Sequence, residues 1–303
     1  MSWSDHFQSP YYLERTRTAI YQPEYFPLIR KWCGVGENKR ILDVGCGSGF
    51  FSRVLASGNE NVSVMGIDLD KGLIEYARTK AKDLPGMDFF EGDALHLPFK
   101  DREFDAVTSH TFLTSVNDPA GALKEMIRVL KPGGILSCIV AMNFENACSS
   151  PGHYPGECTW HKEFELLYHK LWRAYELIDP VSNYAGGLKP SETPGFFAEH
   201  GLLEVSAYPI GKLFSFSNEA RTRQDRLEWL TLYKKSEEER LKAYMSLPGM
   251  RSLFSPDEAG RYMELLDEKC RYLKDHIGEN RIWEWSGGVN MLVRGIKNSE
   301  EGL

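Results

Sequence analysis

The chain of 303 residues lacks several features that would assign it to a protein class at once. Its six cysteines form no C-x-x-C pair, and a chain of this length can bury a core without disulfides. Its longest apolar run, from Ile135 to Met142, is far shorter than the roughly 20 residues that span a bilayer. The first residues carry no charged-then-apolar signal sequence. We therefore expect a cytoplasmic protein with reduced cysteines and no membrane-spanning segment.

An excess of basic residues is also lacking. The chain has 36 Lys and Arg against 43 Asp and Glu, which gives a formal net charge of -7. A broad phosphate-binding surface needs the opposite balance, so nucleic acid is a poor candidate for a partner. Internal repeats and low-complexity tracts are absent as well. The organisation of the chain must therefore be deduced from its hydrophobic periodicity.

Buried-strand and amphipathic-helix patterns alternate from residue 40 to residue 142. Between the expected strands, helical periodicity recurs, and Asp70 and Asp118 stand where helix N-caps are expected. The five expected strands are Arg40 to Val44, Val62 to Asp68, Asp88 to Phe90, Phe104 to Thr108 and Ile135 to Met142. Strands and helices in this order predict an α/β fold with a doubly wound, mostly parallel sheet.

The pattern changes after Asn143, where residues 143–190 mix Pro, Gly, Cys and His around one helical stretch. A helix that opens at Thr193 and a strand from Leu203 to Tyr208 resume the sheet. Residues 211–286 are mainly helical, and the apolar run from Val289 to Ile296 is a final strand. We therefore expect one domain over residues 1–303, with a core of 36–142, 191–210 and 287–298. The insertions 143–190 and 211–286 are expected to form a lid over the substrate site.

The clearest motif is Asp43-Val-Gly-Cys-Gly-Ser-Gly49, which stands between a strand and a helix. Glycines there let a ligand approach the backbone and the N-terminus of the helix. The spacing is G-x-G-x-G, and Phe50 and Phe51 follow where a dinucleotide-binding turn would continue toward its third glycine, so NAD is disfavoured. Asp68, which ends the second strand, can accept hydrogen bonds from ribose hydroxyls. Asp93 follows the third strand and can face an adenine amino group.

The chain here resembles the Rossmann-like, class I S-adenosylmethionine-dependent methyltransferases, and within them the branch of ubiquinone and menaquinone biosynthesis. The resemblance covers about residues 40 to 142. It rests on five ordered motifs: Ile41-Leu-Asp-Val-Gly-Cys-Gly-Ser-Gly49, Gly66-Ile-Asp68, Glu91-Gly-Asp-Ala94, Phe104-Asp-Ala-Val107 and Arg128-Val-Leu-Lys-Pro-Gly-Gly134. It implies S-adenosylmethionine as the cofactor and a seven-stranded sheet whose last strand, Val289 to Ile296, is antiparallel.

The resemblance also implies which residues surround each part of the cofactor. They are Asp43, Gly45, Cys46 and Gly47 for the methionine part, Asp68 and Leu69 for the ribose, Asp93 and Ala94 for the adenine, and Ser109 for the amino-acid end. Each residue alone has a simpler explanation, because glycines make tight turns and aspartates cap helices. In this order and spacing, the set favours cofactor binding.

A catalytic base is less clearly indicated. Relatives often carry His or an aromatic residue in the segment that here reads Leu113-Thr-Ser-Val116, and Thr114 and Ser115 are weak bases. His110, just after the fourth strand, is expected near the transferred methyl group as a base or substrate contact, although an ordinary packed histidine explains it equally well. Methyl transfer to some nucleophiles needs only in-line positioning.

The insertions contain residues that suit a substrate pocket or a metal. Trp160 and Tyr184 are candidate substrate contacts, although most aromatic residues of the insertions are expected to form the core of the lid. Cys148, His153, Cys158 and His161 have side chains that suit zinc, but their spacing matches no standard zinc finger, and we expect no bound metal. The N-terminal residues Tyr11, Tyr12, Arg15, Arg17 and Tyr21 form either a flap over the cofactor or a surface helix.

These observations predict an enzyme that transfers a methyl group from S-adenosylmethionine to a small apolar or aromatic acceptor. Three alternatives differ in class. A protein or RNA methyltransferase would need an open groove, and a non-catalytic S-adenosylmethionine-binding protein would show no turnover. A nicotinamide-dependent dehydrogenase shares only the general fold.

Overall fold

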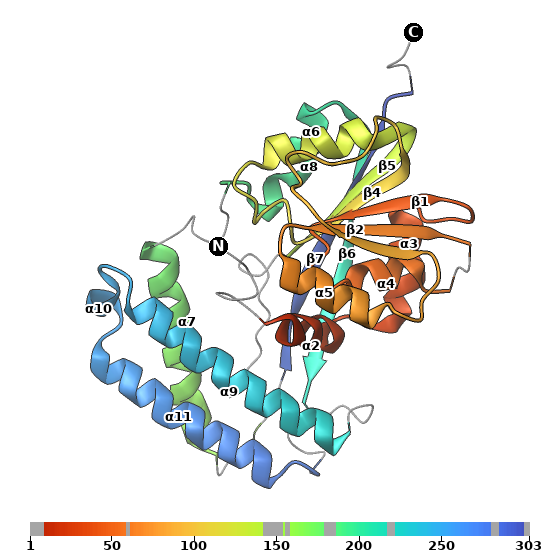
Figure 1. The fold of residues 1–303 in the computed structure, drawn as a ribbon. Helices are drawn as coiled ribbons and strands as arrows, with labels where there is room; N and C mark the ends of the chain where they lie inside the picture. The colour runs from red at the N-terminus through yellow and green to blue at the C-terminus, as the bar shows by residue number, and fades with distance from the viewer. Residues whose placement is uncertain are drawn as a thin grey trace. The chain divides into compact units, whose positions relative to one another are not determined.

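The computed structural model describes residues 9–58, 61–141, 154, 158–178, 186–216, 222–279 and 285–299. The chain divides into two compact units (Figure 1). Unit 1 consists of Met1–Ala147, Asn183–Lys212 and Gly287–Leu303, and unit 2 consists of Cys148–Ser182 and Leu213–Ser286. The arrangement as one domain whose insertions form a lid stays a prediction.

Unit 1 is built on a seven-stranded sheet with the strand order β3-β2-β1-β4-β5-β7-β6. Its strands are β1 (Arg40–Val44), β2 (Ser63–Asp68), β3 (Met87–Glu91), β4 (Phe104–His110), β5 (Leu130–Ala141), β6 (Leu202–Ser215) and β7 (Trp285–Lys297). Strands β1 to β5 pair in parallel, whereas β7 runs antiparallel to β5. The predicted doubly wound, mostly parallel sheet with an antiparallel last strand is confirmed.

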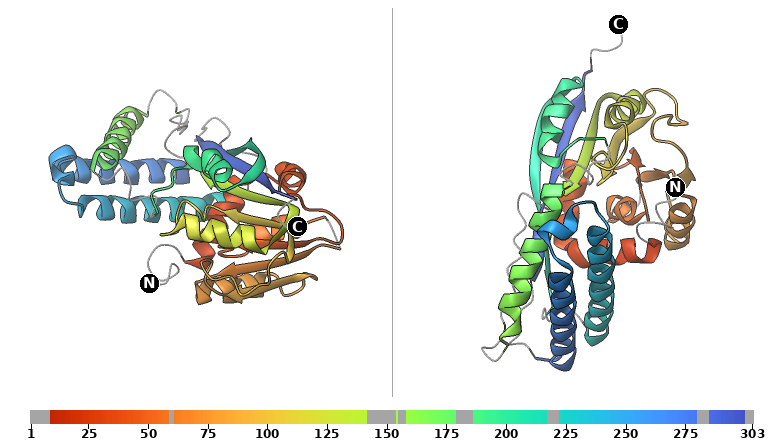
Figure 2. Two further views of the ribbon diagram at one scale, coloured as in Figure 1. Left: turned by 90° about the horizontal axis from the view of Figure 1, so that it is seen from above. Right: turned by 90° about the vertical axis from the view of Figure 1, so that its left-hand side faces the viewer.

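Helices cover both faces of this sheet (Figures 1 and 2). One face packs on α3 (Phe26–Trp32) and α4 (Phe50–Ala56), and the other packs on α6 (Pro119–Val129) and α8 (Thr193–Glu199). Helix α5 (Lys71–Lys80) packs on β2 and β3. Side chains alternate between the two faces along β1, so that Ile41 joins the first core and Leu42 joins the second. A sheet that is buried on both faces explains the apolar strands of the sequence.

The helices begin at the caps that the sequence indicates. The carboxylate of Asp70 accepts a hydrogen bond from the backbone N–H of Leu73, and that of Asp118 accepts one from Gly121. Ser255 forms a capping box with Glu258 at the start of α11 (Pro256–Asp275). Helix α9 (Arg223–Met245) begins after the capping residue Thr222.

Strand β5 begins five residues before the expected Ile135. Leu130 pairs with Phe104, and the register then shifts, so that Ile135 pairs with Ala106. The segment between them accommodates this shift through Gly133, which has a φ of 72°. Lysine, proline and glycines therefore form an irregular start to the strand.

Unit 2 is helical in the described residues. Helix α11 packs against both α7 (Trp160–Ile178) and α9, and the short α10 (Met250–Leu253) packs on α7 and α9. Its interior contains charged groups as well as aromatic rings. Glu237 is buried and accepts a hydrogen bond of 2.5 Å from the hydroxyl of Tyr262. None of the helices in the described part of the chain is long and apolar enough to cross a membrane.

Candidate functional site

The loop between β1 and α4 requires glycine. Gly45, Gly47 and Gly49 have φ values of 70°, 54° and 71°, in the left-handed region that favours glycine. A Cβ atom on Gly45 would lie 2.4 Å from the ring of Phe112, and one on Gly49 would lie 2.9 Å from Cβ of Ala77. The backbone therefore lies close to its neighbours only because these positions have no side chain.

Asp68 ties the end of β2 to this loop. Its carboxylate accepts a hydrogen bond from the backbone N–H of Gly47 and another from that of Asp70, both at 2.9 Å. Burial raises the pKa of Asp68, and these backbone donors oppose that shift. The backbone N–H groups of Gly45 and Cys46 donate to the carbonyl of Ile67. The carboxyl ends of β1 and β2 thus form one polar edge.

Asp43 lies beneath the loop and is fully buried. Its Oδ2 atom accepts a hydrogen bond of 2.6 Å from the hydroxyl of Ser52, whereas Oδ1 has no hydrogen-bond partner within the protein. Burial raises the pKa of Asp43 to about 7, and the nearby Asp68 raises it further while Ser52 lowers it. A buried carboxylate oxygen without a donor is costly, and its position beside the loop suits a ligand that donates hydrogen bonds.

Helix α2 (Pro10–Ile20) packs over the loop from the N-terminal side. Cδ2 of Leu13 lies 3.2 Å from the place of a Cβ on Gly47. Glu14 forms an ion pair with Arg53 and accepts a hydrogen bond of 2.9 Å from Ser48. The helix therefore contacts the candidate cofactor site, and these contacts favour the flap interpretation over a surface helix. Nothing in the sequence identified Leu13 or Glu14.

The adenine and ribose candidates lie at the ends of β2 and β3. Leu69 exposes 71% of its surface, which is unusual for a leucine that follows a buried strand. Asp93 is exposed, and its carboxylate accepts a hydrogen bond of 2.9 Å from the backbone N–H of Leu95, which lowers its pKa. Ala94 is buried beside it. The N–H of Gly92 donates to the carbonyl of Asp68, so the two strand ends are joined.

Ser109 and His110 end β4 and point to opposite faces of the sheet. Ser109 is fully buried, and its hydroxyl has no hydrogen-bond partner among the described residues. The ring of His110 contacts those of Tyr21 and Phe51, with ring centroids 5.3 and 5.4 Å away. Its Nε2 atom is 2.5 Å from the hydroxyl of Tyr21. His110 is therefore part of a polar contact that the sequence did not indicate.

The structure describes only some of the candidate residues in the insertions. Trp160 is 8% exposed and packs against Tyr154 and Tyr272 within unit 2. Tyr184, Cys148 and His153 lie outside the described residues. Cys158 is buried, and its carbonyl lies within hydrogen-bonding reach of the ring of His161. Among the described residues, no three His, Cys, Asp or Glu side chains gather in a way that could hold a metal ion.

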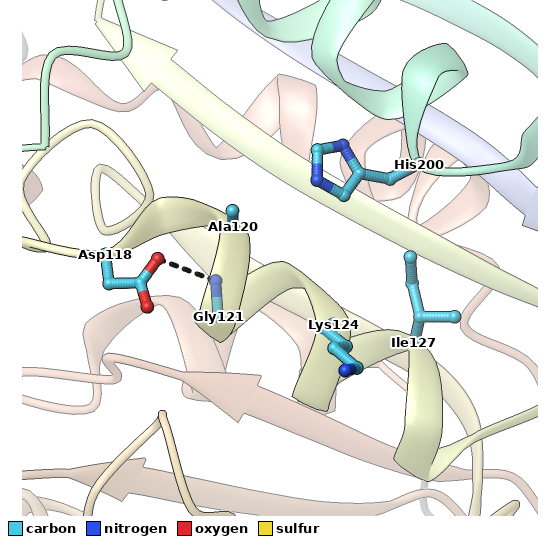
Figure 3. A pocket seen from close by; sticks show the side chains of 6 residues that line it. All are labelled: Asp118, Ala120, Gly121, Lys124, Ile127 and His200. Carbon is cyan, nitrogen blue, oxygen red and sulfur yellow. Dashed lines mark hydrogen bonds between the residues drawn. The ribbon is translucent and has the colours of Figure 1, made fainter.

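A cavity of about 380 Å³ lies elsewhere in unit 1, between α6 and α8 (Figure 3). It is lined by Asp118, Ala120, Gly121, Lys124, Ile127 and His200. It is open to solvent, and the acid in its lining, Asp118, already caps α6. None of the residues expected to hold the cofactor or the acceptor lines it, so it does not mark the site.

Comparison with known proteins gives the family. A family model described as a methyltransferase domain matches residues 42–138. The demethylmenaquinone methyltransferase of Bacillus pumilus is 31% identical over 183 residues, which cover 59% of this chain and 77% of that protein. The enzyme of the same name from Staphylococcus saprophyticus is 37% identical over 112 residues, which cover 37% of this chain and 48% of that protein.

A solved structure extends the similarity of fold to nearly the whole chain. Phosphoethanolamine N-methyltransferase 2 of Haemonchus contortus, in complex with S-adenosylhomocysteine, has a TM-score of 0.52 at 15% identity. The match covers 98% of this chain and 59% of that one. Together with the glycine loop and the sheet order, these similarities show that the chain belongs to the class I S-adenosylmethionine-dependent methyltransferases, in the branch of the demethylmenaquinone methyltransferases.

Proposed function

We propose that S-adenosylmethionine lies along the carboxyl ends of β1, β2 and β3, and that a small apolar or aromatic acceptor lies at the ends of β4 and β5. The strand order supports this division. Strands β2 and β3 lie on one side of β1, whereas β4 and β5 lie on the other, and ligands of such sheets bind where the order changes sides. The cofactor supplies an electrophilic methyl group on a cationic sulfur.

The hydrogen bond between Asp68 and Gly47 is the observation that carries the cofactor assignment. It holds the loop residues Gly45, Cys46 and Gly47 open beside an acid that can accept from ribose hydroxyls. The free Oδ1 atom of Asp43 suits a donor group on the methionine part. The exposed Leu69 would lose its unfavourable contact with water against the nucleoside.

The acceptor assignment rests on the relatives and on the aromatic content of the chain. Demethylmenaquinone methyltransferases act, by name, on a quinone-type small molecule. Tyr21, Phe51 and His110 gather at the end of β4 in this chain. We propose Trp160 and Tyr184 as further contacts, and we propose that the helical unit 2, which contains Trp160, serves as the lid of a single functional domain. Orientation and exclusion of water would then supply much of the rate.

A methyl-transfer assay tests this function. The full chain is incubated with S-adenosylmethionine and either demethylmenaquinone, a panel of small phenols and amines, a protein extract or total RNA, and the products are analysed by mass spectrometry. We expect S-adenosylhomocysteine and a methylated small molecule. Methylation of protein or RNA alone would favour those alternatives, and binding without turnover on any acceptor would favour a non-catalytic protein. A cytoplasmic location stays a prediction of the sequence.

A further inference from the structure

Three side chains from distant parts of the chain meet at the end of β4. The hydroxyl of Tyr21 lies 2.5 Å from Nε2 of His110, and Nδ2 of Asn290 donates a hydrogen bond of 2.5 Å to the same hydroxyl. Tyr21 and Asn290 are almost completely buried, with exposed fractions of 4% and 2%. Buried polar groups are expensive to place in a core, so a hydrogen-bonded set of three calls for a reason.

The set lies on the edge of the sheet where the chemistry is expected. His110 is the last residue of β4, and Asn290 pairs with Ala141, the last residue of β5. Val44, which precedes the glycine loop, pairs with Ser109. The three polar side chains therefore stand on the same edge as the loop, beside the place proposed for the acceptor.

The backbone after His110 adds a second, independent observation. Thr111 has a φ of 52°, in the left-handed region that β-branched residues avoid. Its N–H donates to the carbonyl of Ile139, and its hydroxyl accepts a hydrogen bond of 3.2 Å from Arg17 of α2. Strained backbone of this kind persists where surrounding contacts hold it, and it gathers at functional sites.

The donors and acceptors fix where the protons lie. Burial raises the pKa of Tyr21 well above its usual value, so the hydroxyl stays protonated at neutral pH. Because Asn290 donates to this oxygen, the hydroxyl hydrogen is directed to Nε2 of His110. A neutral His110 then carries its own proton on Nδ1, which lies 3.4 Å from the hydroxyl of Thr111.

We propose that Asn290, Tyr21 and His110 form a proton relay for methyl acceptors whose nucleophilic group carries an ionisable O–H, such as a phenol, an enol or a hydroquinone. This inference rests on the proposed function. The acceptor donates its hydrogen to the remaining lone pair of the Tyr21 oxygen, while the Tyr21 hydrogen moves to Nε2 of His110. The acceptor forms its bond to the methyl carbon as the carbon–sulfur bond breaks, with that electron pair left on sulfur.

The relay keeps Tyr21 neutral throughout, which its burial requires. Tyr21 is the catalytic residue, His110 is the final proton acceptor, and Asn290 is a positioning residue that orients the hydroxyl. The titratable and charged groups that the described contacts place in this network are Tyr21, His110 and Arg17, whose guanidinium reaches the network through Thr111. Phe51 of α4, which also contacts the imidazole, is uncharged.

Nitrogen NMR tests the proton positions without any acceptor. The full chain is labelled with ¹⁵N-histidine, and the His110 signals are assigned by their loss in His110→Gln. We expect His110 in the Nδ1–H form at neutral pH, and a shift toward the Nε2–H form in Tyr21→Phe. Tyr208→Phe is the matched control, because the ring of Tyr208 stacks on that of Trp32 and not on that of His110. An Nε2–H form in the unmodified protein, or an unchanged His110 spectrum in Tyr21→Phe, would overturn the relay.

Kinetics with a hydroxylated acceptor provide the second test. We expect Tyr21→Phe to lower kcat by about 100-fold or more, with the KM for S-adenosylmethionine unchanged. The fall of kcat/KM at low pH, as His110 becomes protonated, should disappear in this variant. A kcat within about twofold of the unmodified protein with the same pH profile would contradict the relay. Failure of the unmodified protein to methylate any acceptor would instead contradict the proposed function, and the NMR result would still decide the proton positions.

Discussion

The carboxylate of Asp68 accepts a hydrogen bond from the backbone N–H of Gly47, and this contact joins the end of β2 to the glycine loop after β1. The same carboxylate accepts from Asp70, so two backbone donors orient it. An acid held in this way presents its remaining lone pairs in one direction. The contact therefore links a sequence motif to a geometry that suits ribose hydroxyls.

The first prediction concerns this acid. Asp68→Ala should weaken S-adenosylmethionine binding by about tenfold or more, because hydrogen bonds to a charged group are lost. Calorimetric titration measures the affinity, and circular dichroism checks that the variant is folded. Asp88→Ala removes an exposed carboxylate from β3 and should leave the affinity unchanged. A folded Asp68→Ala protein with unaltered affinity would remove Asp68 from the site.

The second prediction concerns Gly45. Gly45→Ala should lower the free energy of unfolding by about 1–3 kcal/mol, because the new Cβ meets the ring of Phe112 and the φ of 70° disfavours alanine. Gly195→Ala is the matched control, since nothing lies within 4 Å of its Cβ in α8. There, alanine should stabilise the helix by about 0.5–1 kcal/mol. Urea denaturation of both variants measures the two changes in the free energy of unfolding. Equal changes would contradict this prediction.

The third prediction concerns the pH dependence of stability. Burial raises the pKa of Asp43 from 3.8 to about 7, so between these values the folded protein binds this proton and the unfolded chain does not. The contribution of Asp43 to stability is therefore greatest below pH 4, falls as the pH rises to 7, and totals about 4 kcal/mol.

Asp43→Asn should remove this slope, because its amide oxygen can still accept from Ser52 and carries no charge to bury. Unfolding free energies of the ligand-free proteins at pH 5 and pH 8 provide the measurement. We expect the variant to gain stability relative to the unmodified protein at pH 8. Parallel pH profiles would show that Asp43 titrates normally in the folded state.

The fourth prediction concerns the buried charges of unit 2. Glu237 accepts a hydrogen bond from Tyr262 and pairs with Arg240. Glu237→Ala should destabilise unit 2 by about 3–5 kcal/mol, because Arg240 loses its buried counterion. Hydrogen exchange in α9 and α11 reports the loss. Glu239→Ala, which removes an exposed partner of Lys235, should change little.

If unit 2 serves as the lid, Glu237→Ala should also raise the KM for the acceptor and leave the affinity for S-adenosylmethionine unchanged. The cofactor residues proposed here all belong to unit 1, whereas Trp160 belongs to unit 2. An unchanged acceptor KM in a variant with faster hydrogen exchange would argue against the lid.

Local features of the sequence predicted most of the fold of unit 1. The strands from β1 to β5 coincide largely with the strands expected from the apolar pattern, and Asp70 and Asp118 cap the helices that they precede. Such signals depend on residues that are only a few positions apart, so they can be detected in a single sequence. The start of β5 was missed because its irregular segment of lysine, proline and glycine has no strand pattern.

Long-range contacts could not be predicted in the same way. Tyr21 and Asn290 are 269 residues apart, and their hydrogen bond depends on the pairing of β7 with β5 and on the course of the chain after α2. The contact of Leu13 with the glycine loop is of the same kind. His110 was a candidate from its place after β4, but its partner became visible only in three dimensions.

Calorimetric titration of the full chain with S-adenosylmethionine, S-adenosylhomocysteine and NAD tests the central claim most directly. The glycine loop, Asp43 and Asp68 predict micromolar binding of both adenosyl ligands, loss of much of that affinity in Asp68→Ala, and no binding of NAD. Tight binding of NAD with neither adenosyl ligand bound would contradict the account from the glycine loop onward.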